Sequence, residues 1–419
     1  MKRVFTLVFI VISFITLGTA QTLDKYIEKL ETARNNNGEL SEEYLQALDS
    51  VILQANALNG LNTAILYREK HLETVKKLKG DDSIEAADDL WRLGNLYHRV
   101  GDLDNSMTYY FQAEIVFGNY LNHNKIPYKY VDSYVFCLFS ILDHYKSLMD
   151  QTNVSLYSAK LAKFSTNYYG ISSSDNFEVL SSIGYFNDQV GNKELAFDYC
   201  KIIVDNCTSI DSSNYKNVDA AYSFIKSHYY NKNEYGLMIS TATEHLNKLD
   251  SASIDLTNEI IDALYYLMVM QTKDIGLSIS YGKRAEQLLQ QTHKSIEDLY
   301  LDPKYYRVVS GLALDYDIIS DHVGGLHYHG LCREVLLKSG SKETSGYYKE
   351  LLNCFNVSLA VGEYQTAYSF AEELEPLIFM YSETPMEDAY GYAKDMYIVC
   401  ATLGKYEEAL RYADEAYGL

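Results

Sequence analysis

The sequence predicts an all-α protein built from about nine antiparallel helix hairpins that stack side by side as an α-solenoid. Three observations predict this fold. A sequence block recurs along the chain: a turn at glycine or asparagine is followed by a helix with small residues three or four positions apart. The clearest blocks are 42 residues apart, as from 59 to 101. Only 4 prolines, which end or kink helices, occur among the 419 residues.

The first twenty residues have the pattern of a secretory signal peptide. Lys2 and Arg3 precede an uncharged run over 4–17, and small residues at 18–20 place the mature start at Gln21. We therefore expect an exported protein that is periplasmic, on the cell surface or secreted. The alternative is an uncleaved anchor, although the run is shorter than the roughly 20 residues that span a bilayer. No later run reaches that length, so no membrane span is expected in the mature chain.

Residues 21–38 form the first element after the signal peptide. The stretch from Thr22 to Arg34 is typical of a short amphipathic helix, and the Asn-Asn-Asn-Gly segment at 35–38 ends it. Residues 39–419 contain the repeats. No stretch rich in proline, glycine or serine interrupts them, so one continuous array is expected.

The repeating block joins the two helices of a hairpin. The first helix ends at a glycine or asparagine, which takes the left-handed conformation that closes a helix. The second helix carries small residues three or four positions apart, which let the two helices approach closely. The clearest blocks are Gly101 with Ser106 and Ala113, Gly191 with Ala196, Gly362 with Ala367 and Ala371, and Gly404 with Ala409 and Ala413.

Aligning the blocks predicts the positions of the turns. The steps from 59 to 101, from 191 to 233 and from 362 to 404 are each 42 residues long. Two longer steps end near 150 and 321, which predicts longer loops or a changed packing angle there. The expected turns are Asn59, Gly101, Asp150, Gly191, Asn233, Lys273, Asp321, Gly362 and Gly404.

These blocks resemble the tetratricopeptide repeat (TPR). Leu93, Gly94 and Tyr97 match the L-G-x2-Y segment of its motif, while the tryptophan is displaced by one place to Trp91. The spacing exceeds the family's usual period of about 34 residues and is similar to the longer repeats of kinesin light chains and many bacterial relatives. The resemblance implies a right-handed superhelix with a concave face, and a protein or peptide ligand in its groove.

In that family the first helix of each hairpin lines the concave groove, so the resemblance assigns groove positions. Trp91 is the strongest candidate, because tryptophan and arginine are over-represented at binding hot spots. The alternative is that Trp91 packs between helices as the displaced aromatic of the motif. Some relatives clamp a terminal carboxylate with lysine and asparagine, but here Trp91 replaces the lysine. The candidates are Trp91, Asn95, His98, Arg99, Tyr185, Asp188, Ser227, Tyr230, Lys349, Asn356 and Lys394.

Composition narrows the class of partner. The net charge of -21 disfavours nucleic acid and anionic membrane surfaces, because both require a basic face. The 40 tyrosines supply rings that cover the contacts between helices and hydroxyls that reach water. A groove lined with tyrosine suits peptide backbones and also sugars. The 6 cysteines are too sparse for a disulfide framework, and only Cys200 and Cys207 are close enough in sequence to suggest a bridge.

The common catalytic and cofactor-binding motifs are missing from the sequence, so we expect neither an enzyme nor a bound cofactor. The segment with His322, His327, His329 and Cys332 has poor spacing for zinc, and we interpret it as a glycine-loosened turn without a metal. The acid pairs at 81–82 and 88–89 raise the alternative of a glycosidase. Adjacent helix residues do not face one another, so we expect solvated acids at a helix start.

The last hairpin stops at Leu419 without the polar capping helix that usually finishes an array. Either this hairpin caps itself, or the natural protein continues, which we favour, or a partner covers the end, self-association included. The leading hypothesis is a non-catalytic scaffold that binds a protein or peptide outside the cytoplasm. The alternatives are the sensor portion of a longer signalling or protease-linked protein and, less favoured, a helical hydrolase or glycan-binding protein.

Overall fold

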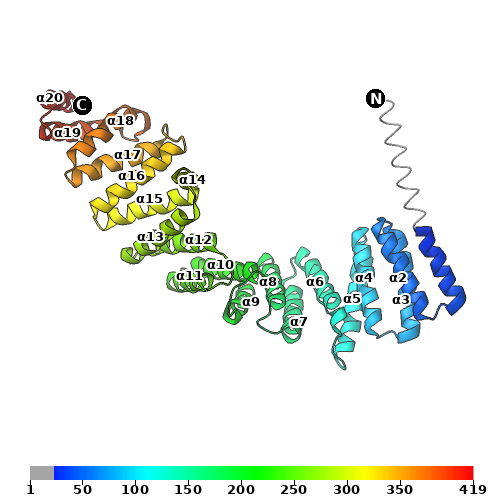
Figure 1. Ribbon diagram of the computed structural model, residues 1–419. Coiled ribbons are helices and arrows are strands. Elements are labelled where there is room, and N and C mark those ends of the chain that lie inside the picture. Colours follow the sequence, from blue (N-terminus) through cyan, green and yellow to red (C-terminus); the bar gives the residue numbers. More distant parts are fainter. Residues whose placement is uncertain (1–22, 419) are drawn as a thin grey trace, which may run out of the picture. The chain divides into compact units, whose positions relative to one another are not determined.

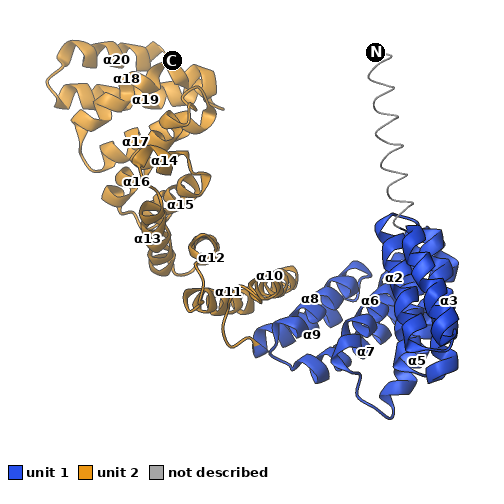
Figure 2. Ribbon diagram, turned by 45° about the vertical axis from the view of Figure 1, so that its right-hand side comes forward, with its two compact units in different colours: residues 1–206 blue, residues 207–419 orange. Residues whose placement is uncertain are grey.

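The computed structural model describes residues 23–418, and the predicted signal peptide at 1–20 lies outside them. Within each of two compact units, consecutive helices pack against one another (Figure 1), and no strand occurs between residues 23 and 418. The chain divides into two compact units after Asn206 (Figure 2). The predicted all-α solenoid is therefore confirmed.

The first unit contains, from residue 23 on, an N-terminal helix and four hairpins. Residues 23–37 are helical and Gly38 follows them with φ 84°, as the sequence predicts. A loop with the 3-10 turn η1 (Tyr128–Tyr130) precedes the third hairpin and accounts for the first longer step. The hairpins are α2 (Glu42–Ala57) with α3 (Leu61–Lys79), α4 (Ile84–Arg99) with α5 (Leu103–Leu121), α6 (Val131–Ser147) with α7 (Gln151–Tyr169), and α8 (Ser174–Gln189) with α9 (Lys193–Asn206).

The second unit contains five hairpins in its described part. The extra short helix α14 (Ile296–Leu301) lies between the second and third of them and accounts for the other longer step. The hairpins are α10 (Tyr215–Asn231) with α11 (Tyr235–Asp250), α12 (Thr257–Met270) with α13 (Ile275–Thr292), α15 (Pro303–Ile318) with α16 (His322–Lys338), α17 (Ser345–Ala360) with α18 (Tyr364–Tyr381), and α19 (Pro385–Thr402) with α20 (Tyr406–Gly418).

The hairpin turns fall close to their predicted positions. Left-handed φ values between 58° and 89° occur at six of the predicted residues: Asn59, Gly101, Gly191, Asn233, Gly362 and Gly404. The turns expected at Asp150 and Asp321 have their left-handed residue one place earlier, at Met149 and Ser320. The turn expected at Lys273 has no left-handed residue. Here α12 ends at Met270, and the side chain of Asp274 caps α13.

Small residues bring the two helices of a hairpin together, as predicted. Ser106, Ala113, Ala196, Ala367 and Ala371 are each at most 1% exposed. In the second hairpin the ring of Tyr110 on α5 lies so close to Gly94 on α4 that a Cβ at position 94 would be 2.5 Å from a ring carbon. Glycine is therefore required there for close packing, not for an unusual backbone conformation.

Many tyrosine hydroxyls donate hydrogen bonds to carboxylates of neighbouring helices. This differs from the expectation that the hydroxyls reach water. Tyr97 on α4 donates to Glu69 on α3 at 2.8 Å, and Tyr412 on α20 donates to Glu375 on α18 at 2.9 Å. A hydrogen bond to a charged acceptor is stronger than one between neutral groups. These tyrosines therefore join neighbouring helices at the edge of the core.

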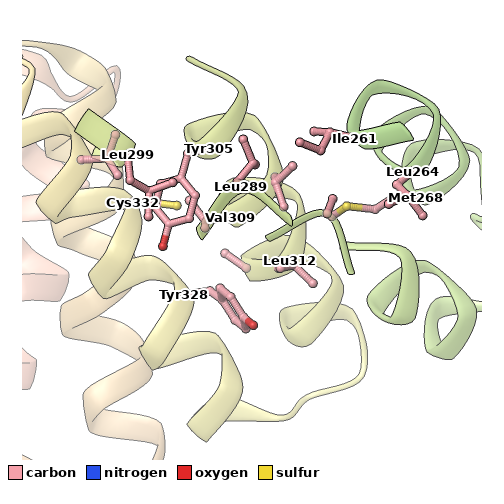
Figure 3. Packing of buried hydrophobic residues seen from close by; sticks show 14 of the residues in the cluster. Ile261, Leu264, Met268, Leu289, Leu299, Tyr305, Val309, Leu312, Tyr328 and Cys332 are labelled. Carbon is pink, nitrogen blue, oxygen red and sulfur yellow. The ribbon is translucent and has the colours of Figure 1, made fainter. Parts of the chain in front are cut away.

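The apolar core continues from hairpin to hairpin within a unit. In the second unit one cluster joins residues of α11 to α16, and Figure 3 shows Leu264 and Met268 on one side of it and Tyr305 and Cys332 on the other. A further cluster joins α17 to α20. A single hairpin cannot bury its apolar side, so each depends on its neighbours. Within residues 23–418, every helix is too short or too polar to span a bilayer.

Candidate binding site

A groove follows α2 and α4, the first helices of hairpins one and two, and α3 contributes side chains to it. It consists of two hollows of about 380 and 150 Å³, which share Leu53, Arg68 and Arg92. We call the two together the α2–α4 groove.

A serine caps the N-terminus of each of these first helices: Ser41 Oγ accepts from an amide of α2, and Ser83 Oγ accepts from an amide of α4. Such caps stabilise a helix by about 1 kcal/mol and fix where it begins.

The larger hollow is lined by a buried network of ion pairs. The Arg68 guanidinium donates to Asp49 Oδ1 at 3.0 Å and to Asp89 Oδ1 at 2.8 Å. His71 Nδ1 lies 2.6 Å from Asp89 Oδ2. Asp89 is only 2% exposed, and Arg68 and His71 are also buried. Because the acids belong to α2 and α4 and both bases to α3, the network fixes three helices relative to one another.

The network perturbs the pKa values of its members. Burial alone would lower the pKa of His71, but the hydrogen bonds and negative charges of Asp49 and Asp89 outweigh it and raise this pKa to about 9. Burial opposes ionisation of Asp49 too, yet His71 and Arg68 hold the pKa of that carboxyl below its usual range. Two bases are thus matched with two acids, which leaves little net charge here for a ligand.

The expectation that the acids at 88–89 are solvated is wrong. Asp89 is buried in the network, and Asp88 accepts from Arg92 Nε at 2.8 Å and from Ser133 Oγ of α6 at 2.5 Å. The physical reason is that α4 presents this turn to α3 and α6 instead of to water. Asp81 and Asp82, in the loop before α4, are exposed.

Three guanidinium groups and no carboxylate line the smaller hollow. Arg68 is paired with the acids of the network, and Arg92 with Asp88. Arg99 instead donates to the neutral amide oxygen of Asn56 at 2.5 Å, and it has no ion pair within residues 23–418. The charge of Arg99 is therefore available to a ligand. The lining consists of Ile52, Leu53, Asn56, Arg68, Trp91, Arg92, Asn95, Leu96 and Arg99.

Trp91 forms one wall of this hollow. Its ring stacks on Phe136 of α6 with centroids 6.2 Å apart, and the Arg92 guanidinium lies 5.5 Å from its centroid. The side chain is half-buried, and its Nε1 finds no acceptor in the described part of the chain. Trp91 therefore combines features of both interpretations, because it packs against a neighbouring helix and also lines a hollow.

The structure brings Trp91, Asn95 and Arg99 together in the smaller hollow. His98 is exposed on α4 but does not line the hollow. Tyr185 and Asp188 lie on α8 of the same unit. The other candidates are exposed residues of the second unit, spread over three first helices: Ser227 and Tyr230 on α10, Lys349 and Asn356 on α17, and Lys394 on α19. Their contact with a ligand stays a prediction.

The members of the ion-pair network other than Asp89, and also Leu53, are not among the residues predicted from the sequence. One signal was available in α3. Arg68 lies on the face that carries the buried Ile65, Leu72 and Val75, so a charged residue stands at a core position of an amphipathic helix. A charge at such a position requires a buried partner of opposite sign.

The histidine-rich segment is a continuous helix and not the loosened turn that the sequence predicts. Asp321 caps α16, and Gly324 lies against the ring of Tyr316 on α15, where a Cβ would come 2.2 Å from a ring carbon. The buried His329 lies between Asp317 (3.0 Å) and Glu350 (2.8 Å), which outweigh burial and raise its pKa. No cluster of side chains suited to a metal ion is found between residues 23 and 418.

Cys200 and Cys207 are free and buried, as are the other four cysteines, so the structure contains no bridge between them. Burial raises the pKa of the Cys200 thiol to about 12, and it also raises the pKa of Cys207. A protonated, buried thiol is a poor nucleophile and a poor metal ligand. These cysteines therefore act as small core residues.

The fold and the groove together define a class of protein, an all-α solenoid of helix hairpins with a mixed polar and aromatic groove on its first helices. The chain matches no model of a known protein family and no curated protein. Similar solved structures include BtubC (BKLC) from P. vanneervenii, with 11% identity, 59% of this chain and 88% of that chain covered, and a TM-score of 0.35. The apo form of RapI has 10% identity, coverage of 95% and 97%, and a TM-score of 0.32. Likenesses this low carry no argument about function, so membership of the tetratricopeptide family stays a prediction.

Proposed function

We propose that the protein is a non-catalytic scaffold that binds a protein or peptide partner outside the cytoplasm, with the α2–α4 groove as the anchoring site. The observation that carries the proposal is the smaller hollow. There a tryptophan, an exposed leucine and a guanidinium that forms no ion pair with any described residue surround two asparagines. Aromatic and arginine side chains at the centre of a hollow are typical of binding hot spots.

An apolar strip supports the proposal. Leu53 on α2 is 68% exposed and Phe136 on α6 is 53% exposed, and Trp91 on α4 stacks on Phe136. Three neighbouring first helices thus present large apolar side chains that are exposed or, in the case of Trp91, half-buried. Contiguous exposed apolar surface of this kind marks interaction sites. A partner would bury an aliphatic or aromatic side chain here.

The charge of Arg99 indicates which polar group the partner should carry beside its apolar side chain. Its present acceptor, the side chain of Asn56, is neutral, and a carboxylate would be a stronger acceptor. The whole chain has a net charge of -21, whereas the lining of this hollow contains basic side chains and no carboxylate. Asn56 and Asn95 add amide groups suited to a peptide backbone. We infer a partner segment with an Asp or Glu next to an aliphatic or aromatic residue.

The acids of the larger hollow favour binding over catalysis. A glycoside hydrolase needs two carboxylates on opposite sides of a cleft, one of them free to give up a proton. Asp49 and Asp89 are instead held by Arg68 and His71, an arrangement that suits a structural purpose. In the alternative where the chain is the sensor portion of a longer signalling protein, the same groove would receive the partner.

Selection of displayed random peptides against the mature chain tests the proposal. We expect the selected peptides to share an acidic residue beside an aliphatic or aromatic one. Trp91→Ala and Arg99→Glu should each weaken their binding, measured by calorimetry, by about tenfold or more, the scale of hot-spot truncations.

Matched controls separate the groove from general effects. Tyr128→Ala removes an aromatic side chain that is 80% exposed in the same unit, and Lys338→Glu reverses an exposed charge in the other unit. Both should leave affinity unchanged. Tyr230→Ala tests the candidate on α10. If the selected peptides bind the Trp91 and Arg99 variants as tightly as the wild type, the groove is not the anchoring site.

A further inference from the structure

A separate hollow lies in the second unit, where the extra helix α14 departs from the two-helix repeat. It measures about 390 Å³ and is lined by residues of α13, α14, α15 and α16 and of the loop before α14. Ile296, Leu299 and Leu331 supply apolar walls. We call it the α14 hollow. It is independent of the α2–α4 groove, so its test and the test of the proposed function fail separately.

Glu286 of α13 is the buried acid of the α14 hollow, and it is 9% exposed. One oxygen, Oε2, accepts from the Tyr328 hydroxyl at 2.9 Å, and the other, Oε1, accepts from Gln290 Nε2 at 3.2 Å. Both donors are neutral. No lysine, arginine or histidine nitrogen in the described part of the chain lies within 4.0 Å of this carboxylate. A carboxylate has about four lone-pair positions, so Glu286 keeps free acceptor positions. The basic side chains in the lining, His293, Lys294 and His327, form no ion pair with it.

Two other buried carboxylates show how this chain otherwise deals with buried acids. Asp89 is matched by Arg68 and His71. Asp315 accepts from the Ser278 hydroxyl at 2.5 Å, and burial raises its pKa, which favours the neutral acid. Glu286 has no basic partner in the described part of the chain, and its two hydrogen-bond donors, Tyr328 and Gln290, are neutral. Burial and the negative charge of Glu286 raise the pKa of its neighbours Tyr305 and Tyr328.

We propose that the α14 hollow binds a primary ammonium group on an alkyl stem, as found in a free alkylamine or in a lysine side chain. The ammonium has three N–H donors, which match the free acceptor positions of Glu286. The stem lies against Ile296, Leu299 and Leu331. A volume of about 390 Å³ is roughly that of a dozen water molecules, which is ample for a short alkyl chain. Because Glu286 is only 9% exposed, little water reaches its carboxylate to screen the ion pair.

The probes for this site are n-pentylamine and, as a neutral control of similar shape, n-pentanol, titrated into the full mature chain with NMR or calorimetry as readout. We expect saturable binding of the amine and none of the alcohol. Glu286→Gln keeps the shape and the hydrogen-bonding capacity of the side chain but removes its charge. Loss of a charged partner should weaken amine binding by roughly tenfold or more. Equal binding of amine and alcohol, or equal binding of the amine by wild type and Glu286→Gln, would overturn the proposal.

Two further variants keep the test specific. Glu297→Gln removes an exposed charge of α14 that does not line the hollow, and it should leave amine binding unchanged. Ile296→Ala shortens an apolar wall residue that is 56% exposed, so the fold should tolerate it. It should weaken binding of n-pentylamine but not of methylamine, whose stem cannot reach the wall. If Ile296→Ala reduces the affinities for n-pentylamine and methylamine by the same factor, the alkyl stem does not lie against Ile296.

The two sources of the ammonium group are distinguished with a blocked Gly-Gly-Lys-Gly-Gly peptide. Tighter binding of this peptide than of n-pentylamine assigns the hollow to a lysine of a protein partner. Tighter binding of the free amine assigns it to a small molecule. In both cases Glu286→Gln must abolish the difference between the cationic probe and its neutral counterpart, norleucine in place of lysine for the peptide.

Discussion

At the scale of single residues, the partners of a buried side chain decide its charge. His71 and His329 each lie between two carboxylates, and the pKa of both is raised. His245, on α11, stacks on Tyr222 with centroids 4.4 Å apart, and neither of its ring nitrogens makes a hydrogen bond in the described part of the chain. Its Nε2 is 3.5 Å from Asp219, but burial and the charge of Lys226 lower the pKa of His245 to about 3. His245 is therefore neutral where His71 is charged.

The raised pKa of His71 predicts that hairpins one and two lose stability as the pH rises towards 9. The ordinary pKa is 6.5 and the value in the folded protein is about 9, so the folded state holds the proton more tightly. The stabilisation is complete below pH 6.5, declines above it and is lost once the pH passes about 9. Its full size is on the order of 3 kcal/mol.

An NMR titration of the His71 imidazole and hydrogen exchange of the α3 amides between pH 6 and 10 measure this effect directly. His71→Gln should be less stable than the wild type at pH 6 and should lack the decline between neutral pH and pH 9. An imidazole that titrates near 6.5 in the folded protein would contradict the described ion-pair network.

At the scale of helices, close approach within a hairpin depends on where small residues stand. Gly94 and Gly118 are both helical glycines of the second hairpin, yet only Gly94 lies against another side chain. A Cβ at 94 would be 2.5 Å from the Tyr110 ring, whereas nothing lies within 4 Å of a Cβ at 118. The same substitution should therefore have opposite effects at the two positions.

Gly94→Ala should destabilise the first unit by about 1–3 kcal/mol, because the ring of Tyr110 must move out of a packed core. Gly118→Ala is the matched control and should stabilise the protein by about 0.5–1 kcal/mol, because alanine loses less backbone entropy in a helix. Urea denaturation followed by circular dichroism, together with local hydrogen exchange in α4 and α5, gives both values. Equal effects at 94 and 118 would show that Tyr110 does not pack on Gly94.

At the scale of the whole molecule, the described part of each unit is a series of hairpins whose cores are shared between neighbours. In repeat proteins of this kind, stability is approximately a sum of hairpin and nearest-neighbour contributions. A binding site formed by two successive hairpins, such as the α2–α4 groove, thus depends on the packing of those hairpins and little on distant ones.

Export is a proposal about the whole chain. The pattern at residues 1–20 lies outside the described residues and predicts cleavage before Gln21. Mass spectrometry of the protein from the exported fraction should find Gln21 at its N-terminus. Replacement of Lys2 and Arg3 by glutamate should reduce the exported amount, because the basic n-region is required for correct insertion. An intact N-terminus on protein confined to the cytoplasm would rule out this location.

The fold class, most of the hairpin turns and the first helices that carry Trp91, Asn95 and Arg99 could be predicted from the amino-acid sequence. These features follow from local patterns: helical periodicity, left-handed turn residues and small residues at fixed intervals, all within one hairpin. The partners of individual side chains, in contrast, become known only from the packing of the helices. Arg99 meets Asn56 across 43 positions, Asp88 meets Ser133 across 45, and Glu286 meets Tyr328 across 42. Contacts of this range depend on the rotation of each helix and on how successive hairpins pack, and no local pattern encodes either.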